Sequence, residues 1–524
     1  MTTAFEGGGG EEARRTASVR PAEVALLASV FVVAACGLVY ELAAGTLASY
    51  LLGDSILQFS TVIGTYLFAM GVGSYLSRFF ERQLVAHFLR IELLVGLIGG
   101  LMPAALFALQ SLASGSFRFA LYLLVLAVGV LVGLEIPLVM RILKRQGQGL
   151  SHLVSQVLTF DYLGALAVAI AFPLLLVPQL GLIRTGAFFG LLNAGVAVWA
   201  LLLFRGELRR FAAHAGACAV TIAALLGAFV AADHVTTWAE DRFYADHVLY
   251  SENTPYQRVV VTASKQGVRL FLNGNLQFHS RDEYRYHEAL VHPAMAAHGA
   301  PKNVLVLGGG DGLAAREILK YPSVEHVTLV DLDAHVTQLF STQPLLRQLN
   351  ADALLSPKMK IVNADAYAWL EQTTDQYDVI VIDFPDPTNF SIGKLYTSSF
   401  YRLVDQHLSA AGYAVVQTTS PLIARKSFWT VATTIEAAGL QTTPYHVHVP
   451  SFGEWGFILA SRRPYRLPGT PNALPPGLRF LTLADLSTLF NFPLDMARVP
   501  AEVNRLSNQV LVQTFEDEWG KVHQ

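Results

Sequence analysis

Five aspartates in the second half of the chain each follow a short apolar stretch, and their carboxylates could meet at one ligand. They are Asp311, Asp331, Asp365, Asp383 and Asp386. Any one of them could simply cap the helix that follows it, because aspartate is a favoured N-cap residue. The apolar stretches, however, have the pattern of buried parallel strands, whose carboxyl ends share one rim of a sheet. Five acids on one rim predict a site for a ligand that carries positive charge.

The first of these acids lies inside a glycine loop, VLVLGGGDGLAAREILK, at residues 304–320. Gly308, Gly310 and Gly312 form the pattern G-x-G-x-G, and the last glycine of the dinucleotide pattern G-x-G-x-x-G is missing. Glycines allow a ligand to approach the backbone closely. Asp311 would repel a pyrophosphate and would attract a cationic nucleoside.

The remaining acids suit the parts of such a nucleoside. Asp331 follows the second strand, about 20 residues after the loop, where a carboxylate can bind the ribose hydroxyls. Asp365 follows the third strand, at a spacing suited to the amino group of adenine. The sulfonium S-adenosylmethionine fits, and its decarboxylated form fits better, because Asp311 would bind the propylamine ammonium and repel an intact carboxylate. Asp383 and Asp386 would then receive a second substrate, an amine.

The strands that position these acids alternate with helices from Lys302 onward. Five buried strands with intervening helices predict a doubly wound, Rossmann-like α/β domain at residues 301–465. Residues 245–300 contain short alternating segments, and the pair Asn273-Gly274 predicts a hairpin, so we expect a small antiparallel β-sheet there. Residues 466–524 are assigned to a C-terminal extension.

The first half of the chain has a different composition. Hydrophobic residues make up 53% and charged residues 15% of the whole chain, against roughly 25% charged in soluble domains. The bias lies in residues 22–232, after a tail at 1–21 that we expect to be flexible. Because a membrane-spanning helix needs about 20 apolar residues, the region predicts a multi-pass α-helical membrane domain of about seven spans, at 23–46, 56–79, 89–111, 118–140, 154–177, 180–204 and 213–232.

Arginine and lysine gather in the tail and after the second, fourth and sixth of these spans. This asymmetry predicts a multi-pass protein of the cell (inner) membrane with a cytoplasmic N-terminus. Seven spans would place the second half outside, whereas S-adenosylmethionine is made in the cytosol. Either the segment 213–232 does not cross, or another segment is re-entrant, or the second half faces outward.

Acidic residues inside the predicted spans are costly and often functional. Glu41, Glu135 and Asp161 could form a polar path for a cation or a proton. They could equally make hydrogen bonds between helices, and the bundle could serve only as an anchor.

Other functions are disfavoured by composition. The formal net charge of −3 argues against nucleic acid as a main partner. Cys36 and Cys218 lie in apolar runs and predict neither a disulfide nor a metal site.

The motifs of the second half resemble those of the spermidine synthase (polyamine aminopropyltransferase) family. Within residues 254–387 they occur in the order TPYQ, RDEYRYHEAL, LGGGDG, VDLD, NADA and DFPDP. The resemblance covers roughly 245–465, and the segments LVYELAAGTLASYLLG and LRFLTLADLSTLFNFPLDM resemble the membrane-fused branch. It implies transfer of an aminopropyl group from decarboxylated S-adenosylmethionine to an amine, by default putrescine, giving spermidine and methylthioadenosine. It also implies a homodimer formed through the N-terminal strands.

The resemblance implies a role for each matched residue. On the nucleoside side, Gln257 and Asp331 would hold the ribose and the nucleoside. Asp365 would bind adenine, and Asp311 would bind the ammonium of the aminopropyl group. On the acceptor side, Asp383 would accept a proton from the amine, which would be oriented by Tyr286, His287 and Asp386. His287 has an equally ordinary interpretation as a packed side chain, and we interpret Trp455 as core.

The sequence departs from the family on the acceptor side, where DFPDP is followed by TNFSIGKLY, and Ala366 replaces a glycine. Two alternatives therefore stay open. One is other S-adenosylmethionine chemistry, such as methyl transfer or cyclisation. The other is a polyamine transporter or sensor whose soluble half binds without turnover, which is motivated by Glu41, Glu135 and Asp161.

Overall fold

The structure, a computed structural model, describes residues 21–52, 55–112, 114–145, 150–244, 246–468 and 473–521. The tail expected to be flexible lies outside these residues except for Pro21, which begins the first helix. The chain divides into two compact units, one of Met1–Ala48 with Gln58–Phe243 and the other of Ser49–Leu57 with Tyr244–Gln524.

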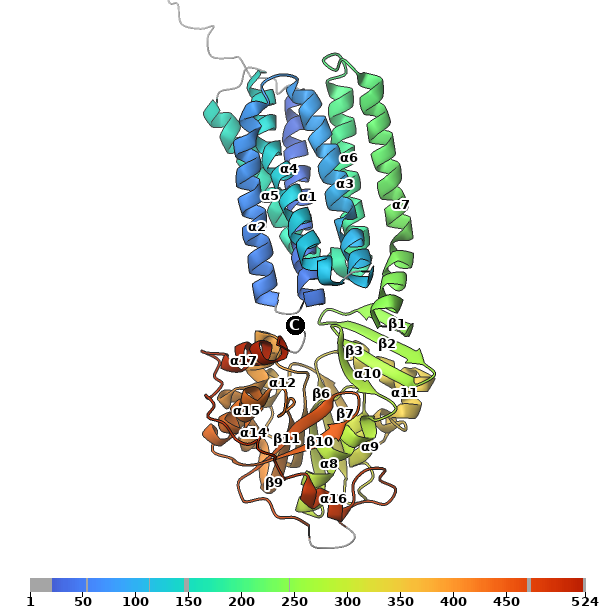
Figure 1. The fold of residues 1–524 in the computed structure, drawn as a ribbon, viewed down its shortest axis with the longest axis vertical. Coiled ribbons are helices and arrows are strands. Elements are labelled where there is room, and N and C mark those ends of the chain that lie inside the picture. The colour runs from blue at the N-terminus through green and yellow to red at the C-terminus, as the bar shows by residue number, and fades with distance from the viewer. Residues whose placement is uncertain are drawn as a thin grey trace, which may run out of the picture. The chain divides into compact units, whose positions relative to one another are not determined.

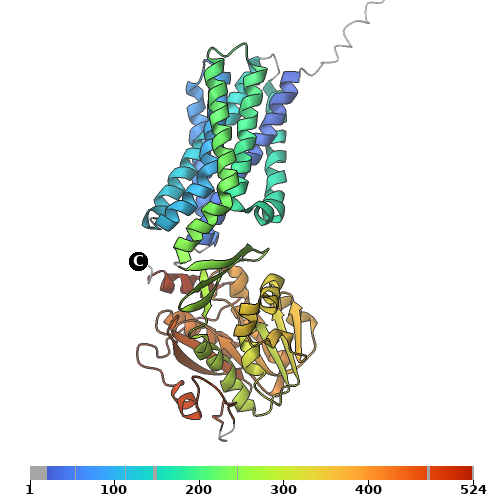
Figure 2. The same ribbon diagram turned by 90° about the vertical axis from the view of Figure 1, so that its right-hand side faces the viewer.

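The first unit is a bundle of long helices that run side by side (Figure 1 and Figure 2). Short helical turns at Ser77–Phe79, Ser114–Ser116 and Phe172–Leu176 connect or extend them. In the described residues the long helices are α1 (Pro21–Leu52), α2 (Ser55–Leu76), α3 (Leu84–Leu112), α4 (Phe117–Arg145), α5 (Leu150–Ala171), α6 (Val177–Leu203) and α7 (Phe211–Tyr244).

Six stretches of the described residues are long and apolar enough to cross a membrane. The sequence predicts about seven, and the difference lies in Leu153–Leu203, a single stretch of 51 residues. That stretch contains both α5 and α6, because helical hydrogen bonding continues through a π-turn at Phe172–Leu176. The backbone kinks at Gly181, whose φ is 72°. The chain thus has seven long helices among its described residues, and α7 extends 12 residues beyond the predicted end at 232.

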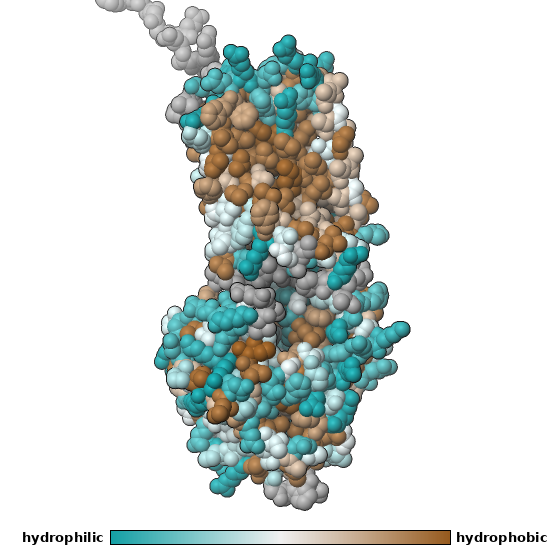
Figure 3. Space-filling view, viewed as in Figure 1, coloured by the Kyte–Doolittle hydropathy of each residue, from teal (hydrophilic) through white to brown (hydrophobic). Residues whose placement is uncertain are grey.

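The surface of the bundle is apolar over its middle, with hydrophilic side chains gathered at one end (Figure 3). Among the exposed side chains, Phe68 is 68%, Phe119 74% and Leu174 74% accessible. Inside the bundle, small residues bring helices into contact. A Cβ placed on Gly96 of α3 would lie 2.8 Å from the carbonyl oxygen of Gly190 in α6.

The second unit begins with a four-stranded antiparallel sheet in the order β1-β2-β3-β4. Its strands are β1 (His247–Asn253), β2 (Arg258–Ser264), β3 (Gly267–Leu272) and β4 (Asn275–His279). The predicted hairpin is confirmed, because Asn273 and Gly274 connect β3 and β4 with φ values of 50° and 81°. Positive φ at both central residues is the requirement of a type I′ turn.

The main sheet has seven strands in the order β10-β11-β9-β8-β5-β6-β7. The five predicted strands are parallel, and an antiparallel pair that was not predicted extends the sheet beyond β9. The strands are β5 (Asn303–Gly308), β6 (His326–Asp331), β7 (Met359–Asn363), β8 (Tyr377–Asp383), β9 (Leu408–Gln417), β10 (Gln441–Val449) and β11 (Gly453–Ser461).

Helices cover both faces of this sheet. Along β5, Val304 and Val306 pack into one core cluster, whereas Leu305 and Leu307 pack into the other, as the period-two geometry of a strand requires. The first face is covered by α8 (Glu283–His298), α9 (Leu313–Ile318), α10 (Ala334–Thr342) and α11 (Pro344–Leu349). The second is covered by α12 (Ala366–Gln372), α14 (Ser398–His407), α15 (Arg425–Ala437) and α17 (Val510–Trp519). Shorter elements are η4 (Ala353–Leu355), α13 (Phe390–Gly393), η5 (Lys394–Tyr396) and α16 (Leu483–Thr488).

Candidate active site

The predicted rim of the sheet exists, and its centre lies where the strand order reverses between β5 and β8. Gly308, the last residue of β5, is in register with Asp383, the last residue of β8. On the other side of β5, Asp331 ends β6 and is in register with Asn363 of β7. Such a reversal opens a crevice at the carboxyl ends of the strands, where ligands of doubly wound folds bind.

The glycine loop has the backbone that its sequence predicts. Gly308 and Gly312 have φ values of 82° and 78°, a region that other residues enter with difficulty. A Cβ on Gly308 would lie 2.2 Å from the carbonyl oxygen of Asp383, and one on Gly310 would lie 2.7 Å from Oδ2 of Asp331. The glycines therefore bring the backbone against two of the predicted site acids.

Asp331 is held in place by backbone amides. Its Oδ2 accepts a hydrogen bond from the N–H of Gly310 at 3.0 Å, and its Oδ1 accepts one from Asp333 at 2.8 Å. Burial raises the pKa of Asp331 to about 6, although these amides oppose the shift. Gln257 is close by, but it contacts the neighbouring acid, because its side-chain amide donates to Oδ2 of Asp333 at 3.0 Å.

Asp311 lies at the start of the helix that follows the loop. Its Oδ1 accepts a hydrogen bond from the N–H of Leu313 at 2.9 Å. Burial raises the pKa of Asp311, while the nearby His287 opposes this increase. A half-buried carboxylate attracts a cationic group.

Asp383 is bound by a residue from α8, because the hydroxyl of Tyr286 donates to its Oδ1 at 2.6 Å. Burial raises the pKa of Asp383 to about 6; His287 and the bond from Tyr286 lower it, and Asp311 raises it further. The structure thus brings Tyr286 and His287 of α8 together with Asp311 and Asp383.

Asp386 has a buried oxygen, Oδ1, that finds no hydrogen-bond partner among the described residues. Burial raises the pKa of Asp386 to about 7, and a hydrogen bond from Gln417 opposes the shift. Gln417 ends β9, and its side-chain Oε1 accepts from the indole N–H of Trp455 at 3.2 Å. Trp455 is 7% exposed and belongs to the core, as we interpreted it.

Asp365 has a more local role than an adenine contact alone. Its Oδ1 caps α12 by accepting from the N–H groups of Tyr367 and Ala368, at 2.9 and 3.2 Å. Its Oδ2 pairs with the ammonium of Lys394 at 2.5 Å. Burial raises the pKa of Asp365, but the bonds from Lys394 and from the amides outweigh burial and lower it overall. Asp365 therefore caps α12, and a ligand that displaced Lys394 could also bind its Oδ2.

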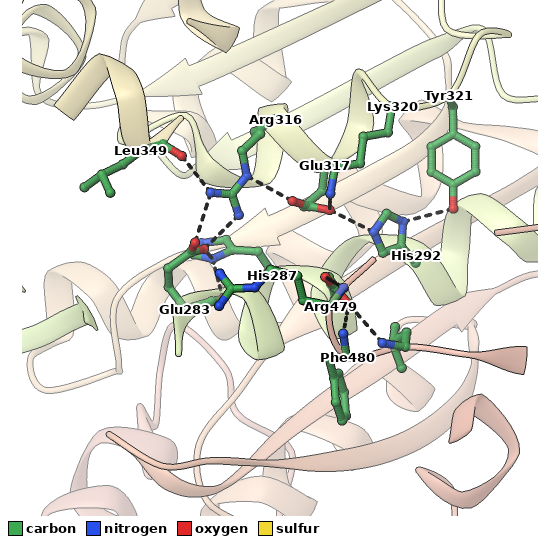
Figure 4. A network of polar contacts seen from close by, with 12 residues as sticks. Glu283, His287, His292, Arg316, Glu317, Lys320, Tyr321, Leu349, Arg479 and Phe480 are labelled. Atoms are coloured by element: carbon green, nitrogen blue, oxygen red, sulfur yellow. Dashed lines mark hydrogen bonds and ion pairs between the residues drawn. The ribbon is translucent and has the colours of Figure 1, made fainter. Parts of the chain in front are cut away.

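His287 belongs to a chain of buried charges behind the site, which Figure 4 shows with Arg316 between Glu283 and Glu317. Nδ1 of His287 lies 2.8 Å from Oε2 of Glu283. Burial lowers the pKa of His287, but Glu283, Asp311 and Asp383 together raise it to about 8. His287 is therefore a cation at neutral pH, packed and also electrostatically coupled to the site.

The network continues away from the site. The guanidinium of Arg316 donates to both oxygens of Glu283, at 3.0 and 2.9 Å, and to Glu317 at 2.9 Å. Glu317 also accepts from His292 at 2.9 Å and from Lys320 at 2.6 Å. Fully paired buried charges of this kind rigidify the elements that carry them. Here they link α8 to α9, the helix that follows the glycine loop.

Three residues of the site were not predicted: Glu283, Lys394 and Gln417. Glu283 lies in the quoted motif RDEYRYHEAL, four residues before His287, which is the spacing of neighbours on one helix face. Lys394 lies in TNFSIGKLY, the segment that departs from the family pattern. Gln417 ends the fifth predicted strand on the same rim as the acids, so rim position alone could have identified it.

The arrangement can bind cations at several points. Four half-buried acids, Asp311, Asp331, Asp383 and Asp386, lie at this rim of the sheet. No group of three or more His, Cys, Asp or Glu residues in the described part of the chain could hold a metal ion. Asp383 and Asp386 have pKa values of about 6 and 7, which suit proton acceptors that work near neutral pH.

Known proteins are similar in sequence to this chain over most of its length. Residues 283–467 match the spermine/spermidine synthase domain. A polyamine aminopropyltransferase 2 of Ralstonia nicotianae is 56% identical over 94% of this chain and 98% of its own length. A polyamine aminopropyltransferase of Leptospira interrogans is 49% identical over 95% and 99%, and one of Mycobacterium tuberculosis is 39% identical over 99% and 100%.

Among solved structures, a spermidine synthase in complex with the transition-state analogue AdoDATO is 28% identical, with a TM-score of 0.44, and covers 47% of this chain and 85% of its own. The similarity to the curated relatives extends over nearly the whole chain, including the helical bundle. The chain belongs to the polyamine aminopropyltransferase family.

Proposed function

We propose that this aminopropyltransferase moves the aminopropyl group of decarboxylated S-adenosylmethionine to putrescine, giving spermidine and methylthioadenosine. The observation that carries the proposal is the buried Oδ1 of Asp386, three residues after Asp383, which has no hydrogen-bond partner in the described part of the chain. An unpartnered buried carboxyl oxygen is costly unless a ligand satisfies it, and an ammonium or amine N–H would do so. The relatives named polyamine aminopropyltransferase support the same chemistry.

The nucleoside side uses three acids. Asp331, held by two backbone amides, presents its carboxylate to the ribose hydroxyls, and Gln257 lies beside it. Asp365 binds the amino group of adenine once Lys394 releases its Oδ2. Asp311 binds the ammonium of the aminopropyl arm and excludes the carboxylate of intact S-adenosylmethionine.

The acceptor side prepares a neutral amine for attack. Asp383 accepts a proton from the ammonium of putrescine, and Tyr286 and His287 keep Asp383 ionised by lowering its pKa. The nitrogen lone pair then forms a bond to the carbon next to sulfur, and the carbon–sulfur bond breaks with its electrons moving to sulfur. Because the sulfonium is already a good leaving group, orientation and deprotonation are the main contributions of the protein.

The test is a product assay on purified full-length protein. The protein is incubated with decarboxylated or intact S-adenosylmethionine and a panel of diamines, and methylthioadenosine and the amine product are measured by mass spectrometry. We expect methylthioadenosine only with the decarboxylated form, and spermidine with putrescine. Turnover with another diamine but not putrescine would contradict the acceptor, and methylated or cyclised products from the intact form would contradict the reaction.

We also propose that the bundle anchors the enzyme in the cell membrane with its N-terminus in the cytoplasm. The apolar surface of the bundle supports the anchoring, and the distribution of Lys and Arg in the loops supports the orientation. Lys265→Cys, at an exposed turn of the small sheet, reports the side of the catalytic unit when intact cells are labelled with an impermeant maleimide. The native thiols Cys36 and Cys218 are buried. Protection in intact cells and labelling after permeabilisation would place the catalytic unit inside.

A further inference from the structure

Two carboxylic acids are buried inside the helical bundle without a hydrogen-bond partner. Glu92 of α3 is 0% exposed and Glu135 of α4 is 1% exposed. All four of their carboxyl oxygens lack a partner among the described residues. The two groups lie close enough to interact electrostatically, and α3 packs against α4. Two unpaired carboxylates cannot both stay ionised at such a place unless a cation is bound between them.

Two neutral polar groups at the same place are also unsatisfied. Asn193 of α6 is 0% exposed, and both atoms of its side-chain amide lack a partner among the described residues. Its Cβ lies 3.1 Å from the position that a Cβ would take on Gly96, one turn after Glu92. Asn193 therefore faces the segment of α3 that carries the acid.

The second neutral group is the hydroxyl of Tyr40 in α1, which is 0% exposed and has no partner in the described part of the chain. The ring of Tyr40 lies against Gly99, 2.8 Å from the position of a Cβ there. Its hydroxyl interacts electrostatically with both Glu92 and Glu135. By contrast, the neighbouring polar groups are satisfied, since Cys36 donates to the carbonyl of Phe189 and Tyr66 to that of Gly37.

Together the four residues offer carboxylate, amide and phenol oxygens, which are hard ligands suited to cations. Only two of the four can carry charge, and the described residues lack the group of three His, Cys, Asp or Glu side chains that a metal site of higher charge would use. Glycines at 96, 99 and 190 pack the helices closely around the cluster. A ligand here must therefore be small, or must present a small charged end.

We propose that Glu92, Glu135, Asn193 and Tyr40 form a binding site inside the bundle for one monovalent cationic group. The group is an alkali-metal ion or the terminal ammonium of an amine, and both satisfy the same oxygens. The site lies wholly within the first unit and does not depend on the aminopropyl-transfer reaction. It gives the membrane half of the chain a role besides anchoring.

The experiment uses infrared difference spectroscopy on full-length protein in lipid nanodiscs. At constant pH and ionic strength, choline in the buffer is exchanged for Na⁺, for K⁺ or for spermidine. Binding converts a protonated carboxyl group to a carboxylate, so we expect the absorption of protonated carboxyl groups to fall. A response to Na⁺ or K⁺ alone identifies an alkali ion, and a response to spermidine alone identifies an ammonium. No response to any of the three would overturn the proposal.

Variants assign the signal to the site. Glu92→Gln and Glu135→Gln should each abolish the response, whereas Glu207→Gln, at an exposed loop position, should keep it. If either buried variant fails to fold, Tyr40→Phe and Asn193→Leu remove one ligand oxygen each and should weaken the cation response at least threefold. A response that persists unchanged in all the variants that fold would refute the site. Methylthioadenosine release, measured in parallel, shows separately whether the catalytic unit is intact.

Discussion

The hydroxyl of Tyr286 donates a 2.6 Å hydrogen bond to Oδ1 of Asp383 and thereby links helix α8 to the end of strand β8. The bond opposes the effect of burial, which raises the pKa of Asp383 to about 6. His287, the next residue along α8, has its pKa raised to about 8 by its acidic neighbours despite burial. One turn of α8 therefore supplies both a hydrogen bond and a positive charge that keep the proposed base ionised near neutral pH.

Asp383→Asn removes the proposed proton acceptor and keeps the shape of the side chain. We expect turnover to fall by about 10²–10⁴-fold, the usual contribution of general base catalysis. Binding of decarboxylated S-adenosylmethionine, measured by calorimetry, should change little, because the proposed nucleoside contacts involve other acids. If binding falls as much as turnover does, Asp383 is a structural residue instead.

Tyr286→Phe removes only the hydrogen bond to Asp383, because the ring keeps its contacts with His287, Phe452 and Phe457. In the native protein the hydrogen bond from Tyr286 lowers the pKa of Asp383. Removing the bond therefore raises that pKa. Since activity needs the carboxylate, the acidic limb of the kcat/KM profile should move about one unit toward higher pH. An unchanged acidic limb, with a uniform loss at every pH, would show that Tyr286 acts only by packing.

The sequence predicts the central sheet well because buried parallel strands consist of continuous β-branched and aliphatic residues, as in VLVLG and VIVID. Their parallel direction then places the five acids at one rim. The antiparallel strands β10 and β11 were not predicted, since β10 contains Pro444 and alternates polar residues. Proline disfavours central strands, and this strand lies at the edge of the sheet.

Sequence patterns do not predict which side chains from distant elements contact each other. Nothing local connects Lys394 to Asp365 or Gln417 to Asp386, because each pair meets only through the packing of separate elements.

Glu92 was not predicted for a different reason. The span was expected to begin at residue 89, which would put Glu92 near its end, whereas α3 begins at Leu84 and carries Glu92 into the interior.

Asp386→Asn should stabilise the protein more at pH 8 than at pH 5. Burial raises the pKa of Asp386 to about 7, against about 3.9 in an unfolded chain. The folded state thus binds the proton more tightly, and stability falls as pH rises from about 4 to about 7. At pH 8 the ionised Asp386 costs about 4 kcal/mol, which asparagine avoids. Tm should therefore rise more at pH 8, as measured by intrinsic fluorescence.

Asp365→Asn is the matched control, and at pH 8 it should change Tm in the opposite direction. Lys394 and two backbone amides overcome the effect of burial and lower the pKa of Asp365. Its stabilising contribution is present above its unfolded pKa and is lost as pH falls through the folded value. Asp365→Asn should therefore lower Tm at pH 8. Equal shifts of Tm at pH 5 and pH 8 for Asp386→Asn would contradict the assignment of a raised pKa.

Lys394→Met should loosen the segment that follows the proposed catalytic acids. The ammonium of Lys394 pairs with Asp365 at 2.5 Å, with both side chains 35% exposed, and so ties η5 to the N-terminus of α12. A partly exposed pair contributes about 1 kcal/mol, so its loss should increase the open population about fivefold. Phe390, 40% exposed in the same segment, is a chymotrypsin site, and its cleavage rate measures the opening.

Lys302→Met, which breaks the surface pair with Glu325, should leave that rate unchanged. If the two variants are cleaved at the wild-type rate, the pair does not restrain the segment, and Asp365 is open to adenine without release of Lys394.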